Sequence, residues 1–226
     1  MIDTLAFVVF PYVAVALVLI VTPYRYFSDR FSYSSFSSEL LQRKGLFWGS
    51  VAWHYGVILI LLAHLAALLA PGAWAALISE PTRLYVLEVT GLALALATVA
   101  GMVVLIGRRL FLPRVASVTT RWDWVVLFVL LAQVALGFWV ALFYRWGSDW
   151  YLHTAVPWIV SLATLNPQTQ FVASLPILVQ IHMLGGFVLL ALFPFTRLVH
   201  MITFPVTYLW RPYQVVIWNR RRRVVP

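Results

Sequence analysis

Apolar residues gather in five long runs along the chain, and polar or aromatic stretches separate the runs. A helix needs about 20 apolar residues to cross the roughly 30 Å hydrocarbon layer of a bilayer, and each run approaches or exceeds that length. We therefore predict an all-α integral membrane protein, a bundle of five transmembrane helices forming a single domain over residues 1–226. The predicted spans cover residues 5–21, 46–70, 84–106, 124–144 and 171–200, with a tail to residue 226.

Composition strengthens the membrane interpretation. The 226 residues are 63% hydrophobic and 10% charged, with a mean hydropathy of +0.91, whereas soluble domains are about 45–50% apolar and about 25% charged. A soluble enzyme, a disordered protein and a nucleic-acid partner are excluded, and the net charge of +9 points to lipid instead. Cysteine is absent, which excludes disulfides, thiolate-held Fe–S clusters and covalent haem attachment.

Basic residues predict the orientation of the bundle. Of the 16 lysines and arginines, all except Arg83 and Arg145 follow the first run, the third run or the fifth run. The positive-inside rule makes that side cytoplasmic, so we expect the N-terminus outside and the C-terminus in the cytoplasm. The outer connection over residues 145–170 is rich in Trp and Tyr, and we expect it to lie flat at the membrane interface.

Four of the five histidines lie on two predicted spans. His54 and His64 belong to the second span, His182 and His200 to the fifth, and His153 falls in an outer connection, where we expect a solvated side chain. Ionisable residues inside a bilayer are costly and face a cavity, cofactor or partner, and imidazole is a common iron ligand. Because the two spans run in opposite directions, His64 matches His182 in depth and His54 matches His200. This predicts two b-type haems, each held by two histidines, one above the other.

The spacing of the histidines requires an irregular helix. Ten helical residues rise about 15 Å, whereas eighteen rise about 27 Å, so we expect Pro194 to kink the fifth span. Gly185 and Gly186 follow His182 within one turn. They either let a flat macrocycle approach the backbone or serve close helix packing.

Two other classes of function remain as alternatives. In a transporter or channel, the histidines would relay protons or bind substrate, and Glu88 inside the third span would be either a proton relay or a helix-packing group. Transporters often carry paired half-repeats, and the chain has no visible repeat. A passive membrane anchor would not need four depth-matched histidines, so an electron-transfer subunit is favoured.

Several motifs resemble the gamma subunit of membrane-bound respiratory nitrate reductase. The histidine pattern begins with Trp53-His54. The stretches "LLQRKG" (40–45), "RRLFLPRV" (108–115) and "LFPFTRLVHMITFPVTYL" (192–209) are more specific. The similarity covers nearly the whole chain in the same order.

The resemblance implies a five-helix dihaem cytochrome b in a bacterial or archaeal cytoplasmic membrane. Such a subunit takes electrons from the quinone pool by oxidising menaquinol or ubiquinol near the outer face. It passes them to an Fe–S beta subunit on the cytoplasmic side, and a molybdenum-containing alpha subunit then reduces nitrate. One haem would be held by His54 and His200 and the other by His64 and His182. The cytochrome b subunit of a formate dehydrogenase or hydrogenase type complex is the alternative.

In this family the quinol site is associated with a lysine near the start of the third helix, where this chain has no lysine. Arg83 or Tyr85 would donate a hydrogen bond to the quinone carbonyl instead, near His64. We expect the basic segment 108–121 and the tail from Arg211 to dock a partner subunit rather than only to contact lipid.

Overall fold

The computed structural model describes residues 1–29 and 43–202, and in this part of the chain every regular element is a helix. Five helical stretches are long and apolar enough to cross a membrane, which confirms the predicted all-helical architecture. They are Ile2–Ser28, Leu46–Leu69, Pro81–Phe111, Arg121–Phe143 and Ile177–Phe195. The tail from Arg211 lies outside the described residues.

The helices and short helical turns follow one another along the chain without a strand between them in the described ranges. Their bounds are α1 Ile2–Thr4, η1 Leu5–Val9, α2 Phe10–Ser28, α3 Arg43–Leu69, α4 Pro71–Ile78, α5 Pro81–Phe111, α6 Pro113–Ala116, α7 Arg121–Phe143, α8 Gly147–His153, α9 Ala155–Ala163, α10 Gln170–Ala173, α11 Ile177–Leu192, η4 Phe193–Phe195 and η5 Arg197–Met201.

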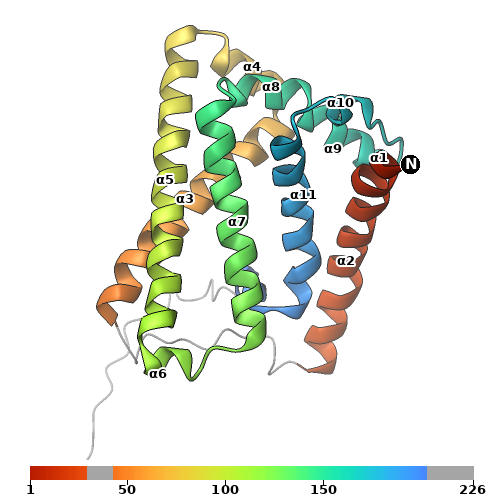
Figure 1. Ribbon diagram of the computed structural model, residues 1–226. Coiled ribbons are helices and arrows are strands. Elements are labelled where there is room, and N and C mark those ends of the chain that lie inside the picture. Colours follow the sequence, from red (N-terminus) through yellow and green to blue (C-terminus); the bar gives the residue numbers. More distant parts are fainter. Residues whose placement is uncertain (30–42, 203–226) are drawn as a thin grey trace, which may run out of the picture.

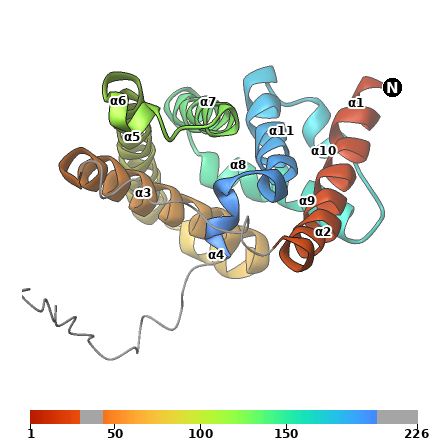
Figure 2. The same cartoon turned by 90° about the horizontal axis from the view of Figure 1, so that it is seen from below.

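The long helices are arranged side by side in a row. In order of contact the row runs α3, α5, α7, α11 and α2, and Figure 2 shows it along the axis of the bundle. The short helices α4, α8, α9 and α10 gather at the end that carries Met1, and α6 lies at the opposite end (Figure 1). We call these the Met1 end and the α6 end. The helix α3 and the helix α11 are not neighbours in the row, although each carries predicted haem ligands.

Proline and capping residues set the helix boundaries. Pro71, Pro81 and Pro113 each open a helix, where the missing proline N–H costs nothing. The carboxylate of Glu80 accepts hydrogen bonds from the amides of Thr82 and Arg83 at the start of α5. Helix α7 begins with a reciprocal capping box between Thr120 and Asp123.

The fifth predicted span is broken into several pieces, so the expectation of one helix over residues 171–200 is wrong. Helix α10 ends at Ala173, and α11 starts only after Pro176. At the other end α11 stops at Leu192 because Pro194 has no N–H with which to continue the helix. Thr196 then adopts an extended conformation, with φ −125° and ψ −179°, before the short turn η5 that carries His200. The expected kink at Pro194 is therefore a complete interruption.

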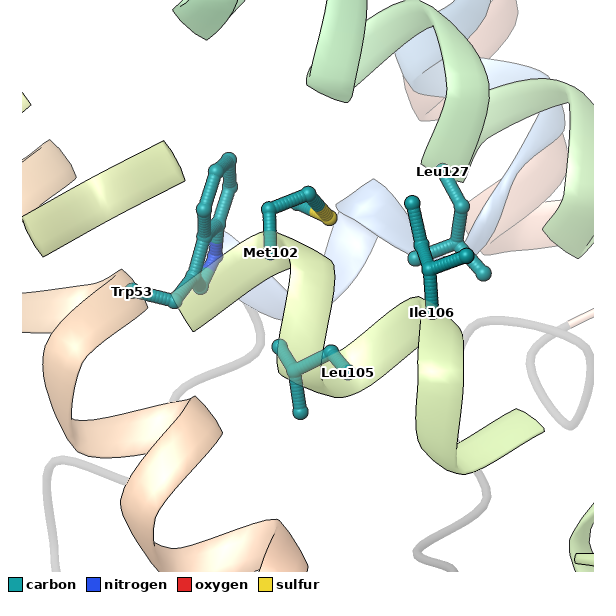
Figure 3. Packing of buried hydrophobic residues seen from close by; sticks show 5 residues of the cluster. All are labelled: Trp53, Met102, Leu105, Ile106 and Leu127. Carbon is teal, nitrogen blue, oxygen red and sulfur yellow. The ribbon is translucent and has the colours of Figure 1, made fainter. Parts of the chain in front are cut away.

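Helices α3, α5 and α7 pack around one buried cluster. The cluster contains Trp53 of α3, Met102, Leu105 and Ile106 of α5, and Leu127 of α7 (Figure 3). Small residues allow the close approach of α3 to α5: a Cβ atom at Gly101 would lie 2.6 Å from the amide nitrogen of Trp53. The fixed position of Trp53 sets the rotation of α3 and thus the direction of the next side chain, His54.

A second cluster joins the short helices to the first span at the Met1 end. It contains Phe7, Trp158, Leu162 and Val172. The indole of Trp158 donates to the carbonyl oxygen of Phe7 at 3.1 Å, and the hydroxyl of Tyr12 donates to that of Leu162 at 2.9 Å. Trp158 is only 1% exposed. The expected interfacial segment is therefore partly a packed element, because α9 fills the space between α11 and the first helix.

Candidate functional site

The structure brings His54 and His200 together near the α6 end. Their ring centroids are 6.3 Å apart and the ring planes meet at 78°. The Nδ1 atom of His54 lies 2.8 Å from the carbonyl oxygen of Ser50, and the Nδ1 atom of His200 lies 2.7 Å from that of Arg197. A carbonyl oxygen can only accept, so each Nδ1 carries the hydrogen. The Nε2 atom of each ring then keeps its lone pair for a ligand.

His64 and His182 lie toward the Met1 end. The Nδ1 atom of His64 is 2.8 Å from the carbonyl oxygen of Ile60, so this ring also keeps Nε2 for a ligand. The side chain of His64 is exposed on a membrane-spanning helix, and His182 lies within electrostatic reach of it. The Nδ1 atom of His182 is buried and has no hydrogen-bond partner. Polar rings in such positions face a cavity, a partner or a cofactor.

These four imidazoles fit the chemistry of haem iron. Two metal–nitrogen bonds of about 2 Å each, together with the radii of the two rings, separate ring centres by about 6 Å, close to the distance between His54 and His200. Structural sites for a bare ion generally need three or more ligands, and the described residues contain no group of three or more His, Cys, Asp or Glu side chains suited to a metal ion. A porphyrin supplies the remaining ligands itself, so histidine pairs suffice.

Helix α8 contacts the His64 ring through one side chain. The ring of Tyr151 meets that of His64 edge to face at a centroid distance of 5.1 Å. The start of α8 is held by the carboxylate of Glu88, which accepts from the amides of Gly147 and Ser148 at 3.3 Å and 2.8 Å. Glu88 thus performs the helix-packing role that was one of its two expected roles. Burial raises the pKa of the Tyr151 phenol, so this group stays neutral at physiological pH.

The fifth histidine lies apart from this site. His153 is exposed, and its Nε2 atom is 3.8 Å from the carboxylate of Asp149. Such an exposed pair contributes little to stability. Its surroundings agree with a solvated surface histidine.

A cavity of 330 Å³ opens beside the start of α5. Its wall is mostly apolar, and its polar members are Arg83 and the hydroxyl groups of Thr82 and Thr90. The full lining is Leu77, Thr82, Arg83, Val86, Leu87 and Thr90. Tyr85 is not part of this lining and is 61% exposed. Of the three expected quinol-site residues, Arg83 alone lines the cavity, and His64 lies on the neighbouring helix α3.

A charged cluster surrounds the turn that carries His200. Arg197 pairs with Asp123 at 3.0 Å, and Asp123 is only 9% exposed. Arg108 is buried, and Asp123 also attracts Arg109. The guanidinium of Arg25 donates to the carbonyl oxygen of Pro194 at 2.7 Å. Part of the segment 108–121, expected to be a docking surface, is therefore buried inside the bundle.

Sequence reasoning missed three residues that contact the histidines or their main chain. The hydroxyl of Ser50 forms a hydrogen bond with His54, and the ring of Tyr151 packs on that of His64. The side-chain amide of Gln133 donates a hydrogen bond to the carbonyl oxygen of His182 at 3.0 Å. Ser50 lies one turn before His54, so helical spacing was an available signal. Gln133 is an amide in the middle of an apolar run, and this isolated polar position was a second available signal. The contact of Tyr151 depends on tertiary structure alone.

Comparison with known proteins gives consistent similarities. The family described as nitrate reductase gamma subunit matches residues 3–219. The nitrate reductase gamma chain of Bacillus subtilis is 33% identical over 94% of this chain and 96% of its own length. The respiratory nitrate reductase 1 gamma chain of Escherichia coli is also 33% identical, over 93% of this chain and 95% of its own length.

A third relative is much longer than this chain. The nitrate reductase-like protein NarX of Mycobacterium tuberculosis is 34% identical over the whole of this chain. The chain spans only 35% of the length of NarX. The similarity to NarX therefore concerns one part of that protein.

Proposed function

Since the chain belongs to the nitrate reductase gamma subunit family, we propose that it is the quinol-oxidising cytochrome b subunit of a respiratory nitrate reductase. It is a multi-pass protein of the bacterial or archaeal cytoplasmic membrane, with the Met1 end outside. It delivers electrons to a cytoplasmic Fe–S beta subunit, and nitrate is reduced on a molybdenum-containing alpha subunit. We prefer this to a formate dehydrogenase or hydrogenase subunit because the relatives it matches carry nitrate reductase names.

The observation that carries the proposal is the arrangement of His54 and His200. Their ring centroids lie 6.3 Å apart, and hydrogen bonds from both Nδ1 atoms leave both Nε2 atoms available. We propose that these two histidines hold one haem b and that His64 and His182 hold a second. When bound, haem supplies an iron that accepts and donates one electron at a time. The protein determines where each iron lies and what surrounds it.

Quinol oxidation is assigned to the cavity at the start of α5. The apolar wall suits a quinone ring and an isoprenoid chain arriving from the lipid. The guanidinium of Arg83 is positioned to donate a hydrogen bond to a quinol oxygen and to stabilise negative charge there as the proton leaves. Each quinol gives up two protons and two electrons in becoming quinone. Of the two haems, the one that His64 and His182 would hold is the nearer to this cavity and would supply the electron acceptor, and the one that His54 and His200 would hold would supply an acceptor nearer the partner.

The arginines of the described residues support this orientation. Arg83 and Arg145 belong to the Met1 end, near the short helices. The arginines of the α6 end lie at the start of α3 and α7, at the end of α2 and α5, on α6 and in η5: Arg25, Arg43, Arg108, Arg109, Arg114, Arg121 and Arg197. This asymmetry follows the positive-inside rule with the α6 end in the cytoplasm.

Reduced-minus-oxidised absorption spectra of the purified membrane complex test the proposal. We expect two b-type signals in the wild type, and we expect menadiol to reduce both. His54→Ala and His200→Ala should each delete the same haem, and His64→Ala and His182→Ala should delete the other. The surface variant His153→Ala is the control and should keep both.

Absence of any b-type signal from the wild type would remove the proposed function. Loss of the same haem in His54→Ala and His64→Ala would contradict the pairing alone. Haems that are present but are not reduced by menadiol would contradict the quinol assignment.

A further inference from the structure

Gln133 on α7 is a polar residue that the proposed function leaves without a role. Its side-chain nitrogen donates to the carbonyl oxygen of His182 at 3.0 Å, although the two residues are 49 positions apart. Its side-chain oxygen is buried and has no partner. A membrane interior offers little water to satisfy such an acceptor, so buried polar groups there are normally paired within the protein. The unpaired oxygen therefore indicates that a donor belongs beside it.

Glycines make room for this contact on both helices. A Cβ atom at Gly185 would overlap the side-chain oxygen of Gln133, whereas a Cβ atom at Gly186 would meet nothing within 4 Å. On α7, a Cβ atom at Gly137 would lie 2.8 Å from Cε1 of His182. The ring of His182 therefore lies against the backbone of α7, one turn from Gln133. Of the two glycines after His182, only Gly185 is required for this packing.

His182 differs from the other three histidines in its hydrogen bonding. His54, His64 and His200 each have Nδ1 within 2.7–2.8 Å of a main-chain carbonyl three or four residues earlier. The Nδ1 atom of His182 is buried without any partner. A histidine that binds metal through Nε2 almost always donates its other N–H to an acceptor, which fixes the orientation of the ring and its donor strength. One buried donor and one buried acceptor are thus left over on adjacent residues of α11 and α7.

We propose that Gln133 is a positioning residue for His182. Its side-chain nitrogen anchors the His182 peptide, and its side-chain oxygen accepts the Nδ1–H, directly or through one bridging water, as a main-chain carbonyl does for the other histidines. This inference rests on the proposed haem-binding function. A hydrogen bond from Nδ1–H makes the imidazole a stronger donor and favours oxidised iron. Loss of the bond should raise the reduction potential of the haem held by His64 and His182 and leave the other haem unchanged.

Redox titration and low-spin electron paramagnetic resonance of the purified complex test this inference. The first pair of variants is Gly185→Ala, whose new methyl group displaces the Gln133 oxygen, and Gly186→Ala, which adds the same methyl group in open space. The second pair is Gln133→Leu and Gln180→Leu. Gln180 is the matched control because its amide donates to carbonyl oxygens next to α10, including that of Leu175 at 2.9 Å, and not to His182.

We expect Gly185→Ala and Gln133→Leu to raise the potential and alter the resonance spectrum of the same single haem, the one lost in His182→Ala. Gly186→Ala and Gln180→Leu should leave both haems as in the wild type. Unchanged potentials in Gly185→Ala and Gln133→Leu, or equal shifts of both haems, would overturn the inference. Reduced haem content with normal properties in the remaining haem would also overturn it, because that result indicates a packing role only. A wild-type complex without b haem would instead refute the proposed function.

Discussion

The histidine pair at the α6 end and the pair at the Met1 end are built from different kinds of structure. His200 sits on a short turn after the interruption at Thr196, and an ion pair between Asp123 and the partly exposed Arg197 holds that turn. His64 and His182 sit on regular helices. Their surroundings are apolar or neutral and include Tyr151 and Gln133. The bundle therefore holds its imidazoles in two different ways.

Because their supports differ, the two histidine pairs should respond to different kinds of substitution. Irregular backbone inside a membrane must have its polar groups satisfied, so the α6 end depends on charged side chains such as Arg25, which bonds the carbonyl oxygen of Pro194. A regular helix satisfies its own backbone, so the Met1 end depends on close packing and on a few neutral hydrogen bonds. Charge substitutions should therefore act mainly on the His54 and His200 pair, and packing substitutions should act wherever helices approach closely.

The largest loss of stability is expected from Gly101→Ala, which disturbs the close contact between α3 and α5. The new Cβ atom would lie 2.6 Å from the Trp53 amide nitrogen and 2.8 Å from the Gly49 carbonyl oxygen, so α3 and α5 must move apart. Overpacking of this kind costs about 1–3 kcal/mol. We expect a lower melting temperature and weaker binding of the haem at His54, because Trp53 sets the rotation of α3.

Gly91→Ala is the matched control on the same helix, since a Cβ atom there would meet nothing within 4 Å. Thermal denaturation in detergent and haem content measure both variants. Equal melting temperatures for the two variants would show that the close approach of α3 and α5 does not limit stability.

A smaller and more local effect is expected from Asp123→Ala. The change removes the ion pair with Arg197 at 3.0 Å and half of the capping box of α7. Removing a carboxylate that pairs with a partly exposed arginine costs about 1 kcal/mol, less than the overpacking at Gly101. Because Arg197 accepts the hydrogen bond from Nδ1 of His200 through its carbonyl oxygen, the haem at His54 and His200 should be destabilised selectively.

Haem content and the two b-type signals, measured against pH and urea, check this prediction. The outcome that contradicts it is equal loss of both haems in Asp123→Ala. That outcome would mean that the charged cluster supports the whole bundle rather than one pair.

The smallest effect is expected at the exposed start of α5, beside the cavity at the Met1 end. Hydrogen bonds from the amides of Thr82 and Arg83 hold the pKa of Glu80 below its ordinary value of 4.5. The lowered pKa means that this cap contributes stability above the ordinary value and loses it as pH falls through the lowered one. Glu80→Gln should therefore flatten the fall in melting temperature between about pH 7 and about pH 3. An unchanged pH profile in Glu80→Gln would show that other carboxylates dominate acid sensitivity.

Local sequence predicts much of the architecture of this protein. Five apolar runs predict five spans because a bilayer accepts only helices of sufficient apolar length, and the structure contains five such helices. The predicted spans begin three residues after the actual starts of α5 and α7, where Pro81 and the capping box of Thr120 and Asp123 stand as local signals. The opposite directions of the second and fifth spans also predict that His54 faces His200, and the two rings lie at 6.3 Å.

Tertiary structure alone decided the rest, because it depends on contacts between residues distant in the chain. Pro194 predicts a disturbed helix from local sequence, but the position that His200 takes beyond the extended Thr196 does not follow from a helical rise of fixed length. The burial of Arg108 and the ion pair of Asp123 with Arg197 depend on where α5 ends and α7 begins relative to η5. The contact between Gln133 and His182 depends on the depth at which α7 and α11 pack. Hydropathy describes how polar each position is, but it does not show which distant residue forms the hydrogen bond or ion pair with a polar side chain.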